Sequence, residues 1–352
     1  MPISQDELRL AARNHGLPLE ALRYPITPAG LHYLLIHYDI PAVDSATYRL
    51  EVDGLVRSPL SLSLEDLRAL PAVELPVTME CAGNGRTLVE PHVTSQPWVL
   101  EAVGTATWRG APLRALLGEA GVEDSAIEVL FTGLDHGVEE GIEQEYQRSL
   151  SLIDAHRPEV LLAYEMNGAP LPPQHGFPLR LVVPGWYGMT SVKWLGRITL
   201  IGEPFDGYQQ SHSYRLRSAE DEPGEPVTRM LPRSLMVPPG VPEFATRSRV
   251  VQAGECFLEG RAWSGQGEIA AVDVSVDGGE TWADAEFDDD LGAPWAWRRW
   301  TYVWDATPGE HELCCRARDE AGNEQPLEPA WNVGGYCNNA VQRVPVSVVA
   351  GD

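Results

Sequence analysis

The chain changes character between residues 206 and 240, and this change limits the folds that it can adopt. Before this stretch, helix signals and strand signals are mixed, whereas after it the helix signals disappear and short alternating runs recur. The stretch itself is polar and rich in Pro, Ser, Arg and Glu, which is typical of a linker or a wrapping arm. We therefore expect two domains, and 352 residues are enough to give each a proper core.

The first part combines helices and strands without strict alternation. Residues 48–54 alternate and end at a glycine, which predicts a strand and a turn. Residues 63–70 have a capping serine and helical spacing, and residues 112–120 repeat the helix signal. Residues 127–132 and 179–183 are predicted strands. This mixture predicts an α+β domain rather than a doubly wound sheet.

Short strands fill the last part of the chain. Such runs occupy residues 254–260, 271–276, 299–304 and 309–317, and the Asp-Gly-Gly turn at 277–279 predicts a hairpin. Strands at this spacing predict an immunoglobulin-like β-sandwich. The expected division is a helical lead-in at 1–22, an α+β domain at 23–215, a linker at 216–240 and the sandwich at 241–352.

One thiol follows a predicted buried strand at residues 75–80. Cys81 is succeeded by Ala-Gly-Asn-Gly and then Arg86, and the glycines let the backbone turn sharply. Arg86 adds a permanent cation that favours thiolate over thiol. A thiolate with open space beside it suits a soft metal. A buried cysteine before a glycine turn is more often a packing residue, so the motif alone leaves both interpretations open.

Several short strings decide between these interpretations. They are MECAGNGR at 79–86, GLD at 133–135, LLAYEMNG at 161–168, HGFPLR at 175–180, VKWLG at 192–196, WSG at 263–265, DGGETW at 277–282 and WAWR at 295–298. In this order they resemble the sulfite oxidase family of molybdenum enzymes over nearly the whole chain. The resemblance implies an N-terminal molybdopterin-binding catalytic domain, a C-terminal Ig-like dimerisation domain and a homodimer.

The resemblance also implies which residues hold the cofactor. Cys81 would bind molybdenum directly, beside the dithiolene sulfurs of a pterin in its simple, non-nucleotide form. A pterin that ends in a phosphate needs cations and hydrogen-bonding groups along a groove. The matching positions are His32, His37, Asp135, His175, Arg180, Ser191 and Lys193. Without the resemblance, Arg180 and Lys193 would be interpreted as residues on a solvent-exposed strand edge. The other cysteines sit in strand patterns and are expected to pack.

A second group of residues matches the substrate pocket of the family. Oxygen transfer to a dianion such as sulfite needs positive charge near the reacting atoms, and arginine binds oxyanions at two points. Arg86 and Arg298 match two pocket arginines, and Trp98 matches a pocket tryptophan. Tyr164, within LLAYEMNG, matches an active-site tyrosine, with a core tyrosine as the alternative.

The segment at 31–41 departs from the family pattern. Many family members carry an arginine there that reaches both substrate and pterin. His37 is the closest match and His32 the second candidate, so a group whose charge depends on pH would replace a permanent cation. This substitution weakens the expectation that sulfite is the preferred substrate.

The most direct function is oxidation of sulfite to sulfate by oxygen-atom transfer. The sequence has no Cys-x-x-Cys-His haem motif, so we expect electrons to leave to a separate protein such as a cytochrome, or to oxygen. One alternative keeps the cofactor but reduces nitrate or sulfoxides. Another is a non-catalytic, adhesive protein that binds through its Ig-like domain.

Composition excludes some partners. A net charge of -25 argues against nucleic acid, which needs a basic surface. No apolar run approaches the length of a membrane span. The N-terminus shows no apolar signal core or twin arginine, and the five cysteines have no regular spacing. We therefore expect a cytoplasmic protein with free thiols.

Overall fold

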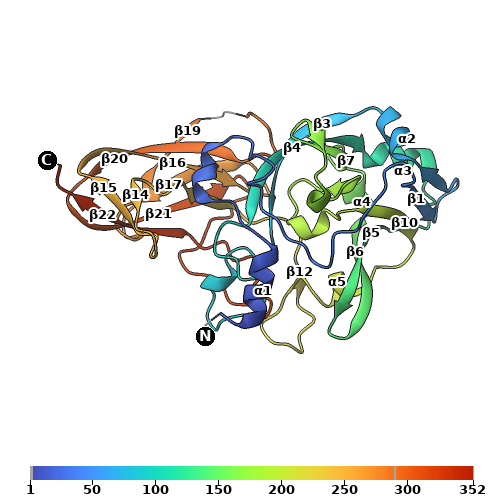
Figure 1. Cartoon of the computed structure of the whole chain (residues 1–352), viewed down its shortest axis with the longest axis horizontal. Coiled ribbons are helices and arrows are strands. Elements are labelled where there is room, and N and C mark those ends of the chain that lie inside the picture. Colours follow the sequence, from blue (N-terminus) through green and yellow to red (C-terminus); the bar gives the residue numbers. More distant parts are fainter. Residues whose placement is uncertain (1–2, 289–290, 352) are drawn as a thin grey trace.

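Two lobes lie side by side in the computed structural model, which describes residues 3–288 and 291–351 (Figure 1). Helix α1 (Gln5–Arg13) lies near the junction of the lobes. Its first turn is closed by a capping box in which Ser4 and Glu7 exchange side-chain and backbone hydrogen bonds. Within the described ranges, no helix is long and apolar enough to cross a membrane.

The first lobe contains two sheets with short helices packed against them. In one sheet, the β1–β10 pair is parallel and the other pairs are antiparallel. Its order is β2 (Leu60–Leu62), β1 (Leu50–Gly54), β10 (Leu195–Ile201), β5 (Glu128–Glu139) and β6 (Ile142–Ser151). The helices are α2 (Leu64–Ala69), α3 (Leu113–Ala120) and α4 (Leu152–Ala155). Leu67 and Leu116 of the helices share a core with Phe131 and Ile198 of the sheet, so the expected α+β arrangement is confirmed.

The second sheet of this lobe ends at Cys81. Its strands are β3 (Val73–Glu80), β4 (Val103–Pro112), β7 (Leu161–Met166), β8 (Ala169–Pro170) and β9 (Arg180–Val182), with β9 paired to β7. The inner half of β3 is buried, and Val77 and Met79 pack on Trp108 of β4. Cys81 therefore directly follows a strand that pairs with β4 along its whole length.

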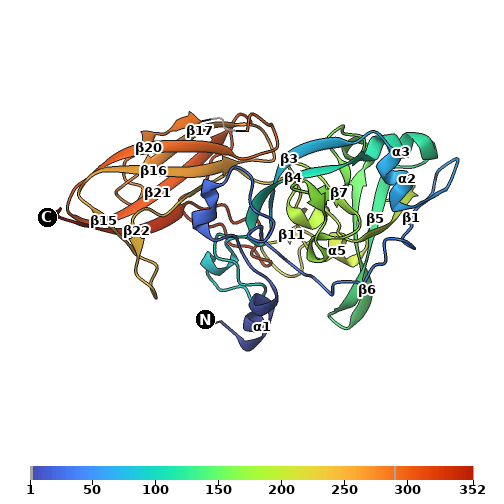
Figure 2. The ribbon, with the colours of Figure 1, turned by 45° about the horizontal axis from the view of Figure 1, so that its top comes forward.

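The second lobe is a sandwich of two sheets, and Figure 2 shows its strands gathered in the orange and red half of the molecule. One sheet has the order β13 (Arg233–Met236), β16 (Gly254–Trp263), β20 (Arg298–Ala306), β19 (Glu286–Asp288). The other has β14 (Val241–Pro242), β15 (Arg249–Gln252), β22 (Gln342–Val349), β21 (Gly309–Asp319), β17 (Ile269–Ser275), β18 (Ala283–Asp284). Leu258 and Trp300 of the first sheet meet Val272 and Leu313 of the second in one core, which confirms the Ig-like sandwich.

The connecting segment is more structured than a linker. It contains α5 (Tyr208–Ser211) and a small ribbon of β11 (Arg215–Leu216) with β12 (Glu225–Pro226). Strand β13 pairs with β16 inside the sandwich, although it falls within the stretch 216–240 that we expected to be linker. The sandwich sheet therefore recruits a strand from the connecting segment.

A buried ion pair joins the two lobes next to Cys81. Glu80 ends β3 and Arg233 begins β13, and Arg233 Nε lies 2.9 Å from Glu80 Oε1. The indole nitrogen of Trp263 donates to the other carboxylate oxygen at 2.8 Å. Asn84 Nδ2 donates to Oε1 at 3.0 Å. A buried carboxylate is tolerated when both of its oxygens are satisfied in this way.

We predict that Arg233→Met lowers the free energy of unfolding by about 3–5 kcal/mol, because the substitution leaves the Glu80 carboxylate buried without its cation. Chemical denaturation measures this loss. Adding Glu80→Gln to the same chain should recover part of the stability, since the uncompensated charge is then removed.

The matched control is Arg109→Met. Its pair with Glu165 spans 3.9 Å and is half-exposed, so the expected loss is below about 1 kcal/mol. An equal loss in the two arginine variants would contradict a special role for the buried pair.

Candidate active site

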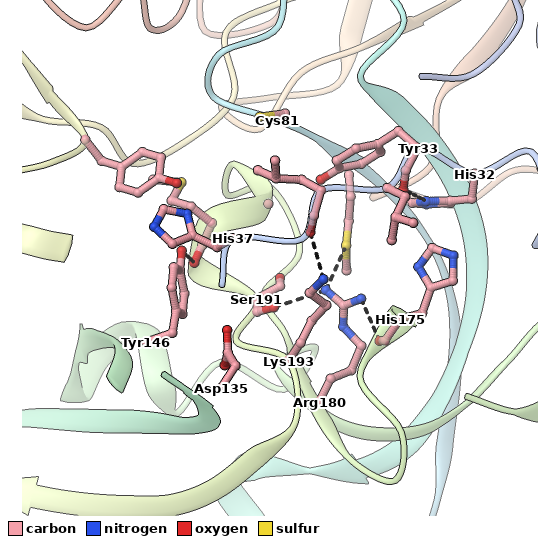
Figure 3. Close-up of a pocket in the computed structure, with 16 residues that line it drawn as sticks. His32, Tyr33, His37, Cys81, Asp135, Tyr146, His175, Arg180, Ser191 and Lys193 are labelled. Carbon is pink, nitrogen blue, oxygen red and sulfur yellow. Dashed lines mark hydrogen bonds between the residues drawn. The ribbon is translucent and has the colours of Figure 1, made fainter. Parts of the chain in front are cut away.

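Two cavities share the side chain of Cys81. The first measures about 70 Å³ and lies in the first lobe (Figure 3). The second measures about 240 Å³ and is lined by Cys81 together with residues of both lobes, such as Trp98 and Tyr336. Residues that line both are Leu35, His37, Cys81 and Tyr214. A group held in the first cavity and a molecule held in the second would therefore meet at the thiol.

The turn after β3 fixes Cys81. Its backbone N–H donates to the Ala102 carbonyl at 2.9 Å, and Gly85 adopts φ 85°, a conformation that favours glycine. A side chain at Gly83 would meet the guanidinium of Arg86 at 2.7 Å. Burial raises the pKa of the Cys81 thiol, and Arg86 opposes that rise. Arg86 thus lowers the pKa of the thiol, as expected, but burial raises it by more. The Cys81 thiol therefore has to lose its proton when it binds metal.

Two cations of the first cavity lack an acidic partner. Within the described residues, neither Arg180 nor Lys193 forms an ion pair, and both bond only to neutral groups. Arg180 donates to the His175 and Ser191 carbonyls at 3.1 and 3.0 Å, and Lys193 to the Leu35 carbonyl at 2.8 Å. Burial lowers the pKa of Arg180 to about 10 and that of Lys193 to about 7. Asp135 offsets part of the Lys193 charge without forming an ion pair, and a bound anion would stabilise both cations further.

The remaining candidates for the cofactor line the same cavity with unsatisfied polar atoms. His32 Nε2 and Asp135 Oδ1 are buried and have no hydrogen-bond partner among the described residues. Burial lowers the pKa of His32 to about 4 and that of His175 to about 2, and it raises that of Asp135 to about 6. The Ser191 hydroxyl accepts from the Val183 N–H at 3.1 Å.

These residues fit the pterin cofactor that the sequence led us to expect. Two cations suit a terminal phosphate, and the orphaned imidazole and carboxylate atoms suit a ring with donors and acceptors. Cys81 supplies the sulfur at the end of the cavity. Figure 3 shows Asp135, Arg180 and Lys193 gathered on one side of the cavity, with Cys81 opposite.

The second cavity carries fewer cations than the sequence suggested. Arg86 lines it, donating from Nε to the Gly334 carbonyl at 2.9 Å. The indole nitrogen of Trp98, also in the wall, has no partner within the described residues. His37 Nε2 lies 3.0 Å from the Glu139 carboxylate, which adds a negative charge to the wall. The positive potential of the wall is therefore modest.

The segment from His32 to Tyr38 contributes to both cavities. His32 lines the first, Tyr38 the second, and Leu35 and His37 line both. Of the two histidines that could replace the arginine of the family, His37 is thus the one that faces both spaces. His32 instead packs edge-on against His175, with ring centroids 5.6 Å apart.

Two expected pocket residues lie elsewhere. Tyr164 is buried in the core of the first lobe, where the Arg68 guanidinium lies 5.5 Å from its ring, and it does not line either cavity. Its motif occupies β7 (Leu161–Met166), whose side chains are buried on both faces of the strand except for Glu165. Arg298 donates to the Ile269 carbonyl at 2.7 Å and lies over Phe287 in a separate cavity of the second lobe. The structure does not bring either side chain to the two cavities beside Cys81.

Other residues take their places. Tyr214 lines both cavities, and Tyr336 of the second lobe lines the second one. The Tyr336 segment holds the Cys81 turn, because the Cys337 N–H donates to the Ala82 carbonyl at 2.8 Å. Both tyrosines lie in irregular stretches between strands, without periodicity. Turn-type residues beside an aromatic, as in GGYCNN at 334–339, were the available signal.

We predict that Lys193→Met makes the cofactor-free protein more stable near pH 7, because it removes a charge whose burial is unfavourable. The pKa of Lys193 is lowered in the folded state, so the unfolded chain binds more protons between about pH 7 and 10.4. The contribution of Lys193 to the free energy of unfolding of the wild type must therefore become less unfavourable as pH rises across this window. The extra stability of Lys193→Met over the wild type must shrink accordingly. Thermal unfolding at several pH values measures the difference. A constant advantage would contradict the buried-charge explanation.

Comparison with known proteins identifies the group to which this arrangement belongs. Models described as the oxidoreductase molybdopterin binding domain and the Mo-co oxidoreductase dimerisation domain match residues 37–209 and 233–349. Mitochondrial sulfite oxidase of Mus musculus is 39% identical over 92% of this chain and 62% of its own length. Sulfite oxidase of Gallus gallus is 38% identical over 90% of this chain and 72% of its own length. The chain thus spans about 62% of the mouse relative.

More distant relatives share the same architecture. Nitrate reductase [NADH] 1 of Oryza sativa subsp. japonica is 33% identical over 92% of this chain and 38% of its own length. The sulfane dehydrogenase SoxCD of Paracoccus pantotrophus superposes with a TM-score of 0.82 at 28% identity, covering 96% of this chain and 86% of that one. With its molybdopterin-binding domain, its dimerisation domain and its cysteine between two cavities, the chain belongs to the sulfite oxidase family of molybdenum-cofactor oxidoreductases.

Proposed function

We propose that the protein oxidises sulfite to sulfate by oxygen-atom transfer. The observation that carries this proposal is the position of Cys81 between a cavity suited to the cofactor and a cavity with oxyanion-binding groups. When bound, the molybdenum cofactor supplies the oxygen-atom transfer and stores the electrons. The identity to animal sulfite oxidases supports sulfur as the atom that is oxidised.

The residues of this chain bind and orient the substrate. Arg86 supplies the permanent cation of the second cavity, and the indole N–H of Trp98, which also acts on the Cys81 thiol, supplies a donor. Tyr214, which lines both cavities, would donate a hydrogen bond from its hydroxyl to the reacting oxyanion. His37, whose Nε2 lies 3.0 Å from the Glu139 carboxylate, is a further polar group in the wall of the second cavity.

The proposal includes how the reaction is completed. Electrons leave to a separate acceptor such as a cytochrome, or to oxygen, and the pterin is of the non-nucleotide form. The dimerisation domain supports a homodimer. The five cysteines are unpaired, which supports a reducing compartment such as the cytoplasm.

Reduction of nitrate or of a sulfoxide is the second candidate. It is favoured by one feature of the second cavity, whose wall holds His37 where a family arginine was expected and also carries the Glu139 carboxylate. A wall with little positive charge holds a dianion less firmly than a monoanion or a neutral molecule. Purified, molybdenum-loaded protein tested with sulfite, nitrate and sulfoxides and artificial redox dyes separates the two. Turnover of nitrate alone would overturn sulfite oxidation.

We predict that Cys81→Ser abolishes oxidation of sulfite while most of the fold remains. Oxygen is a harder ligand than sulfur and changes the redox properties of a soft metal. Elemental analysis measures the bound molybdenum, circular dichroism measures how much of the fold remains, and steady-state kinetics measures the oxidation of sulfite. Near wild-type turnover with bound molybdenum would refute the role of Cys81 as ligand.

Tyr214→Phe and Tyr164→Phe form a matched pair. Removing the Tyr214 hydroxyl should lower kcat for sulfite by roughly tenfold or more, the effect of losing one strong hydrogen bond in the reaction. Tyr164→Phe should leave kcat within about a factor of two, because its ring lies in the core. The opposite ranking would return the catalytic role to Tyr164.

A further inference from the structure

Arg148 is a buried cation that the proposed function does not use. It lies on β6 with 3% of its surface exposed, and one of its guanidinium nitrogens donates to the Gln209 carbonyl. Its Nε has no partner, and no carboxylate pairs with it within the described residues. A buried guanidinium without an acid is unfavourable unless another negative charge is near. The question is which anion supplies that charge.

Arg148 ends a stack of four side chains beside Cys81. Its guanidinium carbon lies 5.6 Å from the centre of the Tyr214 ring. The Tyr214 and Tyr336 rings are 5.1 Å apart at 30°, and the guanidinium carbon of Arg86 lies 5.1 Å from the centre of the Tyr336 ring. Cation, ring, ring and cation thus follow one another, in the separations at which such contacts are favourable.

The two rings of this stack line the second cavity. Both Tyr214 and Tyr336 belong to its wall, as does Arg86, whereas Arg148 lies behind Tyr214. An anion in the cavity would therefore meet one arginine directly and the other through a phenol ring. Glu139, in the same wall, opposes this positive potential from the side of His37.

Arg148 also acts on the phenol that it supports. Burial and the neighbouring phenols and thiol hold the pKa of Tyr214 well above its ordinary value, and the positive charge of Arg148 works against that rise. A phenol polarised by a nearby cation is a stronger hydrogen-bond donor to an anion. The positive charge of Arg148 thus lies next to the cavity wall, on the ring of Tyr214.

We propose that Arg148 is the second cation of the oxyanion site, a positioning residue that acts through Tyr214, and that the bound oxyanion is its missing counter-charge. The inference rests on the proposed function only in taking a tetrahedral or pyramidal oxyanion, such as sulfate or sulfite, as the occupant of the second cavity. It explains how a pocket with one direct arginine holds such an anion within a protein of net charge -25.

The test uses the molybdenum-loaded protein and two readouts. Isothermal calorimetry measures the affinity for sulfate, which needs no turnover, and steady-state kinetics measures KM and kcat for sulfite. Arg148→Met should raise the Kd of sulfate and the KM of sulfite roughly tenfold, with a smaller change in kcat, as expected for one lost charge-assisted interaction. Arg148→Lys keeps the charge and should restore most of the affinity.

Arg157→Met is the matched control. Arg157 is also mostly buried and lies 5.0 Å from the Trp295 ring, but it pairs with Glu159 and lies away from both cavities. It should lower the melting temperature without changing the Kd of sulfate. If Arg148→Met behaves in the same way, Arg148 is merely structural and the proposal is overturned.

The failures of the two proposals are distinguishable. Sulfate binding that depends on Arg148, in a protein that does not oxidise sulfite, would refute the proposed function but support the oxyanion site. Sulfite oxidation with unchanged KM in a folded Arg148→Met variant would support the proposed function but refute the role of Arg148 in the oxyanion site. If that variant does not fold, Arg148→Gln carries the same prediction. If neither folds, a tenfold loss of sulfate affinity in Arg148→Lys would overturn the role of charge.

Discussion

The ion pair between Glu80 and Arg233 holds together the part of the molecule on which everything else depends. It ties the last residue of β3 to the first strand of the sandwich, immediately before Cys81. Hydrogen bonds continue the same connection after the cysteine, because Asn338 Nδ2 donates to the Gly85 carbonyl at 2.7 Å. The second domain therefore braces the turn that carries the thiol, in addition to any role in dimerisation.

Charge is distributed in opposite ways inside and outside the protein. The chain is strongly acidic overall, yet the residues around the two cavities include the buried cations Arg86, Arg148 and Arg180. An acidic exterior repels anions at long range. An anion is therefore selected inside the cavities, where the dielectric constant is low and each cation attracts it strongly. The same interior charges are unfavourable in the empty protein, which makes occupancy and stability interdependent.

Local patterns predicted the first domain well, because caps, alternation and the glycine turn after Cys81 are determined by neighbours in sequence. The residues that we expected to bind the cofactor do line one cavity, since their strings are short and lie at strand ends. Tyr164 and Arg298 were misplaced because each sits in a regular strand, where the direction of a side chain depends on sheet register. Tyr214 and Tyr336 are brought to the site by irregular segments, whose path is set by long-range packing.

One stretch of chain, residues 32–38, contributes to both cavities beside Cys81, which we propose to hold the cofactor and the substrate. Its backbone carbonyl at Leu35 holds Lys193, while His37 faces both spaces. An evolutionary change here that adapts the protein to a new substrate also alters how firmly the cofactor is held. Substitutions at positions of the second lobe such as Tyr336, which lines the second cavity alone, can change substrate specificity without altering the cofactor cavity.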